Sequence, residues 1–334
     1  MQNSVLRVIQ YGLGPIGAAT ARLISARDDL ELVGAVDIDA EKIGKDVAEI
    51  ASMDTKTGVL VSKTLSELGS GVKADVVLHT TNSFFPMFTD QIIEIIEYGC
   101  DVVSTSEELS FPWLANHDSA DRLSKLATCA GKTVLGTGVN PGFLMDCLPL
   151  SLTGICQSVE HIEVIRAMNA SLRRGPFQAK IGSGLSVEEF DRRMQTGLMG
   201  HIGLPESIGM SFDTLGHRLD RYESKVEPVV AEARIETDHF VVEKGQVRGL
   251  RQTAQGFSEG NGFVTKLVFI AALDWHDNHD EIRITGVPSL EMRLSGTNGD
   301  LATVAIAVNA IRRVFESAPG LATMRDLPPV VCGR

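Results

Sequence analysis

The chain has 334 residues, of which 43% are hydrophobic and 22% are charged, and its formal net charge is −12. This length and composition are typical of a globular protein with two domains. The acidic balance argues against nucleic acid or an anionic membrane surface as a partner, and the apolar runs are too short to span a bilayer.

The N-terminal residues Met1 to Ser4 contain no basic stretch followed by an apolar one, so we expect no export signal. The five cysteines are scattered without paired spacing. An odd, unpatterned set of cysteines is typical of reduced thiols in a cytosol. The sequence therefore predicts a cytoplasmic protein.

The first part of the chain alternates short β-rich runs with helical stretches. The predicted strands are residues 5–11, 31–36, 75–80, 101–104 and 133–135. The predicted helices are residues 18–26, 90–98 and 116–130, the last of which is ended by Gly131. Strands that alternate with helices imply a parallel, doubly wound sheet. We therefore predict an α/β protein with an N-terminal Rossmann domain over residues 1–145.

The next part of the chain has few helices and many consecutive strands. The predicted strands are residues 159–167, 228–235, 239–243, 247–255, 263–273 and 281–285, and the predicted helices are residues 187–195 and 205–215. Consecutive strands favour an open, mainly antiparallel sheet. We interpret residues 146–297 as an α+β substrate and dimerisation domain, and we expect a homodimer.

Residues 298–334 are expected to return to the Rossmann domain. They begin with Asn298 to Asp300, a helix start signal, and continue as a predicted helix over residues 301–315.

Three glycines follow the first predicted strand with the spacing G-x-G-x-x-G. They are Gly12, Gly14 and Gly17, and Pro15 and Ile16 stand between the last two. In this pattern the first glycine permits a tight turn, the second lets a pyrophosphate approach the backbone, and the third lets helix and strand pack closely. The start of the helix then offers N–H groups and a partial positive charge to phosphates. The pattern predicts a dinucleotide-binding loop.

Asp37 lies at the end of the second predicted strand, about 20 residues after the glycines, where ribose hydroxyls are bound in this fold. A carboxylate there repels a 2′-phosphate, so the sequence favours NAD over NADP. Lys42 and Lys45 follow Asp37 and either offset part of that repulsion or are solvated surface residues.

Ligands of open parallel sheets bind at the carboxyl ends of the strands. The polar residues at these ends are candidate cofactor contacts, with a plain polar loop as the alternative. They are Thr80, Thr81, Asn82, Ser104, Thr105, Asn140 and Pro141.

Glu107 and Glu108 follow the fourth predicted strand. A carboxylate beside a nicotinamide is able to act as an acid or base, or to stabilise a developing cation. The alternative is an acidic first turn of a helix, which the helix dipole favours.

These segments resemble the native amine dehydrogenases and the 2,4-diaminopentanoate dehydrogenase family, which is distantly similar to dihydrodipicolinate reductase. The resemblance covers nearly the whole chain and is carried by residues 12–17, 36–39, 104–109, 138–143, 173–182, 201–207 and 324–329. It implies reductive amination of a carbonyl compound with ammonia, and the reverse oxidation, with NAD or NADP. It also implies a catalytic glutamate, which we assign to Glu108 first and to Glu107 second. The His-His-x-x-x-Lys-type segment of dihydrodipicolinate reductase has no counterpart in residues 164–171.

The resembling segments and the strand ends also supply candidates for a substrate pocket. These are Val139, Phe143, Arg166, Met168, Asn169, Phe177, Gln178 and His201. The apolar members suit a small hydrophobic ketone or amine. Arg166 suits a substrate carboxylate, with a structural ion pair as the alternative.

The sequence therefore predicts an NAD(P)-dependent amine dehydrogenase. The alternatives are a diamino-acid dehydrogenase, a reductase of cyclic imines and a non-enzymatic Rossmann protein that senses the redox cofactor. Residues 275–280 contain two histidines among acids, but a polar turn is favoured there, and we expect no metal site.

Overall fold

The computed structural model describes residues 4–69, 71–195 and 199–333. Residues 1–3, which carry much of the argument about an export signal, lie outside this range. The chain divides into two compact units, unit 1 (residues 1–143 and 298–334) and unit 2 (residues 144–297). Within the described ranges, no helix has both the length and the apolar character needed to cross a bilayer.

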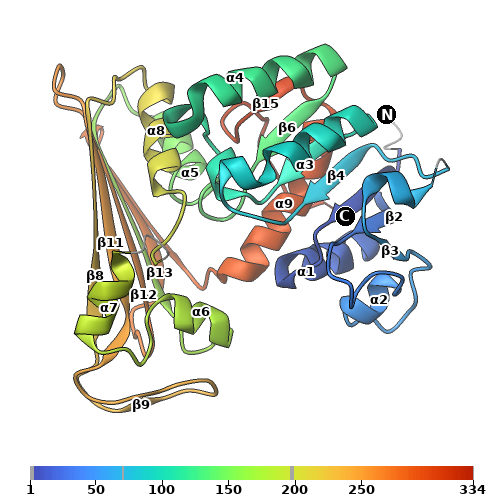
Figure 1. Cartoon of the computed structure of the whole chain (residues 1–334). Helices are drawn as coiled ribbons and strands as arrows, with labels where there is room; N and C mark the ends of the chain where they lie inside the picture. Colours follow the sequence, from blue (N-terminus) through green and yellow to red (C-terminus); the bar gives the residue numbers. More distant parts are fainter. Residues whose placement is uncertain (1–3, 70, 196–198, 334) are drawn as a thin grey trace. The chain divides into compact units, whose positions relative to one another are not determined.

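Unit 1 is built on a seven-stranded parallel sheet with the order β15-β6-β5-β4-β1-β2-β3 (Figure 1). Its strands are β1 (Leu6–Tyr11), β2 (Leu30–Val36), β3 (Val61–Ser62), β4 (Val76–His79), β5 (Asp101–Ser104), β6 (Thr133–Gly136) and β15 (Gly320–Ala322). The central strands β4, β5 and β6 are buried along their whole length, as a sheet covered on both faces requires. The predicted Rossmann topology is confirmed.

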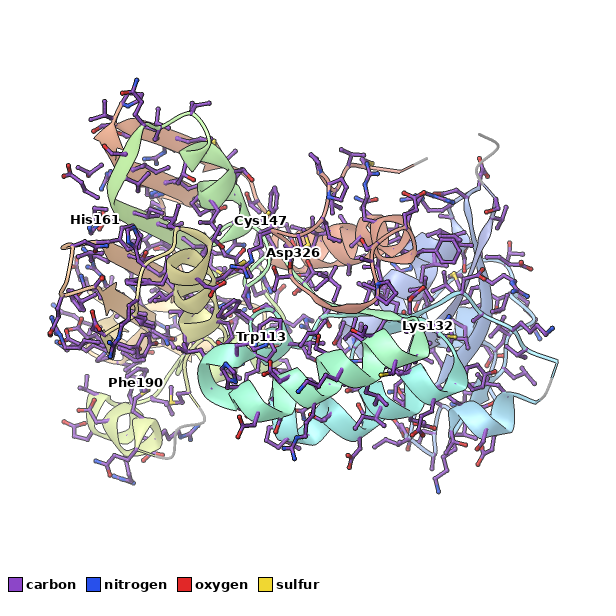
Figure 2. All side chains as sticks on the ribbon, turned by 90° about the horizontal axis from the view of Figure 1, so that it is seen from above. Trp113, Lys132, Cys147, His161, Phe190 and Asp326 are labelled. Atoms are coloured by element: carbon purple, nitrogen blue, oxygen red, sulfur yellow. The ribbon has the colours of Figure 1, made fainter. Side chains whose placement is uncertain are left out.

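Helices cover this sheet in two groups, with α1 packed against α9 and α3 packed against α4. The helical elements of unit 1 are α1 (Pro15–Ser25), α2 (Val47–Ile50), α3 (Phe85–Tyr98), α4 (Trp113–Ala130), α9 (Gly299–Phe315) and the short 3-10 turns η1 (Leu65–Leu68) and η2 (Glu107–Leu109). Figure 2 labels Trp113, the first residue of α4, and Lys132, which follows the helix, and Gly131 ends the helix in the left-handed conformation at φ +66°.

The helix α9 returns to the parallel sheet from the far end of the chain. Asn298 caps it by accepting the N–H groups of Asp300 and Leu301. The helix packs against α1 and against β4, β5 and β6. The predicted start signal is therefore the real cap of this helix.

Unit 2 is built on a six-stranded sheet with the order β14-β13-β7-β12-β11-β8. Its strands are β7 (Ser158–Asn169), β8 (Arg221–Val230), β11 (Val247–Phe257), β12 (Val264–Ala272), β13 (His279–Val287) and β14 (Leu290–Ser295), with β9 (Ile235–Glu236) and β10 (Val241–Val242) as a separate small pair. Only the pair β7/β12 is parallel in the large sheet. The predicted open, mainly antiparallel sheet is confirmed.

The helices of unit 2 are α5 (Cys147–Thr153), α6 (Gly175–Lys180), α7 (Val187–Met194) and α8 (Leu204–Thr214). The helix α8 packs on β11 and β12, and α5 packs on β7 and β13. Residues 275–278 form the turn between β12 and β13, where the Trp275 indole N–H donates to the Asp277 carbonyl at 3.1 Å.

Some element boundaries were predicted wrongly. The strand expected over residues 228–235 is β8, which runs over Arg221–Val230, because charged residues alternate along its exposed side and hide its β pattern. The helix expected from residue 90 begins at Phe85, with Pro86 in its first turn. Strand β14 was not predicted, since its residues alternate with charged neighbours in the same way.

Candidate active site

The glycine loop joins β1 to α1. Gly12 has a φ of +87°, and a Cβ atom there would lie 2.6 Å from the Thr80 carbonyl oxygen. A Cβ atom at Gly17 would lie 1.9 Å from the Gly12 carbonyl oxygen, so close packing of helix on strand requires this glycine. A Cβ atom at Gly14 would meet nothing within 4 Å. Gly12 and Gly17 are thus needed by the fold itself, whereas Gly14 leaves open space, as a bound pyrophosphate requires.

The helix that follows the loop begins at Pro15, three residues earlier than the sequence predicts. Gly14 is its N-cap residue and Pro15 stands in its first turn. Pro15 is exposed and Ile16 is half-buried. The positive end of α1 therefore faces the loop that we expect to bind phosphates.

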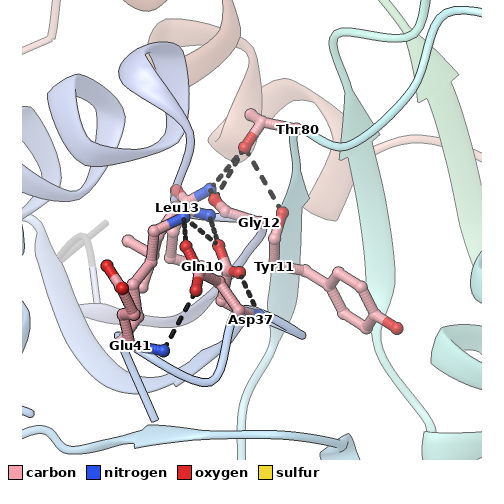
Figure 3. A network of polar contacts seen from close by, with 9 residues as sticks. Gln10, Tyr11, Gly12, Leu13, Asp37, Glu41 and Thr80 are labelled. Carbon is pink, nitrogen blue, oxygen red and sulfur yellow. Dashed lines mark hydrogen bonds and ion pairs between the residues drawn. The ribbon is translucent and has the colours of Figure 1, made fainter.

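A largely buried hydrogen-bond network fixes the glycine loop (Figure 3). The Gln10 amide donates to the Gly12 carbonyl and to the Thr80 hydroxyl oxygen, both at 2.9 Å. The Thr80 hydroxyl donates to the Gly12 carbonyl at 2.8 Å, and the Thr20 hydroxyl donates to the Gln10 amide oxygen at 2.7 Å. Thr80 thus positions the loop. Gln10 and Thr20 were not predicted, although a glutamine inside a buried apolar strand was a usable signal.

Asp37 follows β2 and lies against the glycine loop. Its carboxylate accepts the N–H of Leu13 at 2.7 Å and the N–H of Asp39 at 2.9 Å. The Lys42 ammonium is 3.1 Å from Asp37 and 3.4 Å from Asp39. Burial opposes the charge on Lys42, but these two carboxylates outweigh it and raise the pKa of Lys42. The carboxylate that we expect to meet the ribose is therefore held by the loop and partly balanced by a cation.

The polar residues after β4 and β5 hydrogen-bond within unit 1. The Thr81 hydroxyl lies 2.9 Å from His79 Nε2, and Asn82 Oδ1 accepts the N–H of Phe84 at 3.0 Å. The Ser104 hydroxyl lies 2.9 Å from His79 Nδ1, and the Thr105 N–H donates to the His79 carbonyl at 3.0 Å. These residues shape the carboxyl edge of the sheet, and His79 is the neighbour that the sequence analysis missed.

The two acidic candidates lie in the short turn η2 and are both half-buried. The Glu108 carboxylate accepts the N–H of Phe85, the first residue of α3, at 2.6 Å. The Glu108 N–H donates to the Ser83 carbonyl at 3.2 Å. Glu108 is therefore held at the positive end of α3, where the helix dipole attracts an anion. The expected alternative, an acidic first turn, is also present, because both glutamates stand in the first turn of η2.

The loop after β6 is tightly folded and largely buried. Gly142 has a φ of +120°, and a Cβ atom there would lie 2.6 Å from the Gly138 nitrogen. The Val139 N–H donates to the Thr303 hydroxyl at 3.3 Å. Asn140, joined to Pro141 by a cis peptide bond, is 9% exposed, and Phe143 is half-buried.

In unit 2, Arg166 forms a buried ion pair. Its guanidinium lies 2.8 Å from Asp280 on the neighbouring strand, and the two side chains are 3% and 5% exposed. Burial lowers the pKa of Arg166 and raises the pKa of Asp280, and their mutual attraction opposes both shifts. The structural ion pair that we considered for Arg166 is therefore present.

Other candidates from unit 2 also make internal contacts. The buried Gln178 amide donates to the carbonyls of Ser171 and Arg173 at 3.0 and 2.7 Å and accepts the Thr237 hydroxyl at 2.9 Å. The His201 ring stacks on Phe269 with a centroid distance of 4.5 Å. Gln178 thus fixes the loop before α6.

Three further candidates lie near the same loop of unit 2. Asn169 Oδ1 accepts the N–H of Ser171 at 2.9 Å. The Arg173 guanidinium lies 4.5 Å from the centre of the Phe177 ring. Met168 is 9% exposed.

Comparison with known proteins identifies relatives over the whole chain. Residues 143–332 match the family model of the 2,4-diaminopentanoate dehydrogenase C-terminal domain. The 2,4-diaminopentanoate dehydrogenase of Acetoanaerobium sticklandii is 32% identical over 333 residues, covering 97% of this chain and 93% of that protein. An amine dehydrogenase of Streptomyces virginiae is 23% identical over 352 residues, covering 97% and 96%.

A solved structure shares the fold. The amine dehydrogenase of Mycobacterium smegmatis is similar with a TM-score of 0.86 and 21% sequence identity, covering 98% of this chain and 97% of that chain. The family model and the 32% identical relative settle the relationship, which the sequence motifs predicted. The chain belongs to the 2,4-diaminopentanoate dehydrogenase family.

Proposed function

We propose that this protein is an NAD(P)-dependent amine dehydrogenase that catalyses the reversible reductive amination of a small ketone or aldehyde with ammonia. Its family makes it an oxidoreductase acting on CH–NH2 groups. The observation that carries the proposal is the Glu108 carboxylate, which is fixed at the carboxyl edge of the sheet that also bears the glycine loop.

Reductive amination passes through a cation. Ammonia attacks the carbonyl carbon, water leaves, and the resulting iminium carbon accepts a hydride, which the nicotinamide cofactor supplies when bound. A carboxylate close to that carbon stabilises the cation electrostatically and is able to bind the incoming ammonia and transfer protons. Glu108 suits this role, because Phe85 and the dipole of α3 hold its carboxylate in one place.

The loop and Asp37 support a nicotinamide dinucleotide, and we propose a preference for NAD. The Asp37 carboxylate lies where the ribose hydroxyls are expected, and a 2′-phosphate there would be repelled. Lys42 offsets part of that repulsion, since its ammonium lies 3.1 Å from the same carboxylate. The proposal is therefore a preference, with use of NADP retained.

A diamino-acid dehydrogenase is the second candidate, and the 32% identity with 2,4-diaminopentanoate dehydrogenase favours it. Its substrate carries a carboxylate that needs a cation. Arg166 already pairs with the buried Asp280, so this arginine does not supply a free one. A reductase of preformed cyclic imines is less well supported, because residues 164–171 contain no histidine or lysine.

A substrate panel tests the proposal. Simple ketones, aldehydes and 2-amino-4-oxopentanoate are each supplied with NADH or NADPH, with and without ammonia, and the loss of reduced cofactor is followed. We expect consumption that depends on ammonia and is faster for simple ketones than for the amino-acid ketone. Faster turnover of 2-amino-4-oxopentanoate would select the second candidate. Tight cofactor binding without turnover of any carbonyl would favour a redox sensor and overturn the proposal.

Two matched variants locate the chemistry. Glu108→Gln removes the charge and should lower turnover at least about 100-fold, the usual scale for one acid–base group. Glu107→Gln is the control in the same turn, and we expect it to keep most of the activity. A Glu108→Gln variant with near-wild-type turnover would remove Glu108 from the mechanism.

We also propose that the protein is a cytoplasmic homodimer that assembles through the long strands of unit 2. The five scattered cysteines, all of which lie in the described part of the chain and are free there, support the first part. Light scattering coupled to size-exclusion chromatography tests the second part. A mass near the 36.0 kDa of the single chain would contradict it.

A further inference from the structure

His79 is a buried ionisable residue that the proposed mechanism does not use. It ends β4, and its partner in the parallel register is Ser104, which ends β5. Both side chains are 0% exposed. His79 therefore lies under the carboxyl edge of the sheet, one strand away from the turn that carries Glu108.

Both ring nitrogens of His79 have hydrogen-bond partners. Nε2 lies 2.8 Å from the Gln91 amide oxygen, and Nδ1 lies 2.9 Å from the Ser104 hydroxyl. Burial lowers the pKa of His79 to about 4, so the ring is neutral at neutral pH. Nε2 faces an amide oxygen, which only accepts, and Nδ1 faces a hydroxyl, so both sides of the ring are fixed by polar neighbours.

The Ser104 hydroxyl continues this chain of contacts into the turn. The Ser106 N–H donates to Ser104 Oγ at 3.2 Å, and the two hydroxyl oxygens are 3.0 Å apart. The Ser106 carbonyl then accepts the Leu109 N–H at 3.1 Å, which closes η2 around Glu108. The imidazole thus reaches the candidate catalytic turn through two serines.

The other side of the ring leads to the same carboxylate. Gln91 belongs to α3, and the first N–H of α3, from Phe85, donates to Glu108. His79 therefore connects α3, which holds the Glu108 carboxylate, to the end of β5, which precedes the turn that contains Glu108. With both attachments in place, the carboxylate has one position relative to the sheet edge.

We infer that His79 is a positioning residue for Glu108, acting through Ser104 on one side and through Gln91 and α3 on the other. The inference rests on the proposed function, because it assigns His79 a role in amine turnover. A displacement of about 1 Å in a catalytic group costs up to about 100-fold in rate. Removal of the imidazole should therefore lower kcat by about 10- to 100-fold, with little change in the affinity for cofactor.

Three variants test the inference. His79→Leu removes the contacts of the ring with Ser104, Gln91 and Thr81. His79→Asn keeps an amide near the place of Nδ1 and should recover a part of kcat. Tyr11→Phe is the matched control, because it keeps the ring 5.5 Å from His79 and removes only the hydroxyl contact with Glu94 of α3, which involves neither Gln91 nor Ser104. We expect Tyr11→Phe to leave kcat unchanged.

A double-mutant cycle separates positioning from a general loss of structure. If His79 acts through Glu108, His79→Leu should lower kcat less than about 2-fold further in the Glu108→Gln background. An equal loss in both backgrounds would overturn the inference. So would a His79→Leu variant with wild-type kcat, or a rise in KM at constant kcat.

Hydrogen exchange gives a readout that does not need turnover. In His79→Leu, the amides of residues 104–110 should exchange at least about tenfold faster than in the wild type and in Tyr11→Phe. Unchanged exchange there would contradict the inference even in an active enzyme. Faster exchange in a protein that aminates no ketone would instead contradict the proposed function alone.

Discussion

The carboxyl edge of the unit 1 sheet and the centre of the unit 2 sheet both contain buried polar side chains, and they differ in what those side chains contact. In unit 1, Gln10, Thr80 and Asp37 hydrogen-bond to the backbone of the glycine loop and fix its shape. In unit 2, Arg166 and Asp280 neutralise each other across two strands.

The direction of the strands explains the difference. Parallel strands end at one edge, so loops from several strands meet there, and their polar groups can be arranged around a ligand. Antiparallel neighbours place side chains opposite one another along the whole strand, and opposite charges then pair within the sheet. Polar residues at the strand ends of unit 1 are thus candidates for ligand binding, whereas polar residues within the strands of unit 2 can pair with each other and stabilise the sheet.

The largest effect that this comparison predicts concerns the ion pair of unit 2. Arg166→Met leaves the Asp280 carboxylate buried without its cation and should lower the free energy of unfolding by about 3–5 kcal/mol. Urea denaturation measures it. The double variant Arg166→Met/Asp280→Leu should recover most of the loss, since a hydrophobic pair of similar volume is often neutral.

An Arg166→Met variant of unchanged stability would instead favour a functional role for Arg166. A stable Arg166→Met variant whose KM rises for a carboxylate-bearing substrate but not for a simple ketone would do so. That outcome would also favour the diamino-acid dehydrogenase over the amine dehydrogenase.

The pH dependence of stability tests the buried histidine of unit 1, His79. Its folded pKa of about 4 lies below the ordinary 6.5, so the unfolded chain binds the proton more readily. The stabilisation is complete above pH 6.5 and is lost as the pH falls toward 4, by about 3 kcal/mol in total. The nearby Tyr11, whose pKa burial and Glu94 raise to about 12, stays neutral over this range.

Urea denaturation at several pH values between 4.5 and 7.5 measures this loss. In His79→Asn, the slope of the unfolding free energy against pH should fall by up to about 1.4 kcal/mol per pH unit. The wild-type minus variant difference removes the contribution of His161, whose pKa burial also lowers. An identical slope in both proteins would show that His79 does not titrate in this way.

The glycine loop and the first strand ends of unit 1 could be predicted from the sequence. Gly12, Gly17 and Asp37 have requirements that act locally, namely a positive φ, a close packing and a strand end, and such requirements leave a pattern in the sequence. His79 was missed because its partner Ser104 lies 25 residues away, and Gln10 was missed because its amide joins the nearby Gly12 to Thr80, which lies 70 residues away.

In unit 2, the contacts of the candidate residues also depend on distant partners. Arg166 meets Asp280, 114 residues later, and Gln178 meets Thr237, 59 residues later. Spacing along the chain carries no signal for contacts at such distances. The sequence therefore predicted the sheet types and the loop, but it did not decide which polar residues of unit 2 are structural.

Two glycine variants distinguish the glycine that the fold of unit 1 requires from the glycine that we expect to face the cofactor. Gly17→Ala drives a Cβ atom into the Gly12 carbonyl and should both destabilise the protein and weaken cofactor binding at least about 100-fold, or about 2.7 kcal/mol. Gly14→Ala meets open space, so its unfolding free energy should stay close to that of the wild type while cofactor binding weakens. Fluorescence titration with NADH and urea denaturation measure the two effects. Tight NADH binding by Gly14→Ala would show that the phosphates do not approach this residue.

The smallest expected effect concerns the balance between Asp37 and Lys42, and it tests whether unit 1 selects the cofactor by charge. Asp37→Asn keeps an oxygen for the Leu13 N–H but removes the negative charge, so the ratio of kcat/KM for NADP to that for NAD should rise about tenfold, or about 1.4 kcal/mol. Lys42→Gln removes the cation 3.1 Å from that carboxylate and should lower the same ratio by a few-fold. Because the two substitutions change the local charge in opposite directions, the ratio must move in opposite directions. A shift of the same sign in both variants would mean that loop shape, and not charge, determines which cofactor is used.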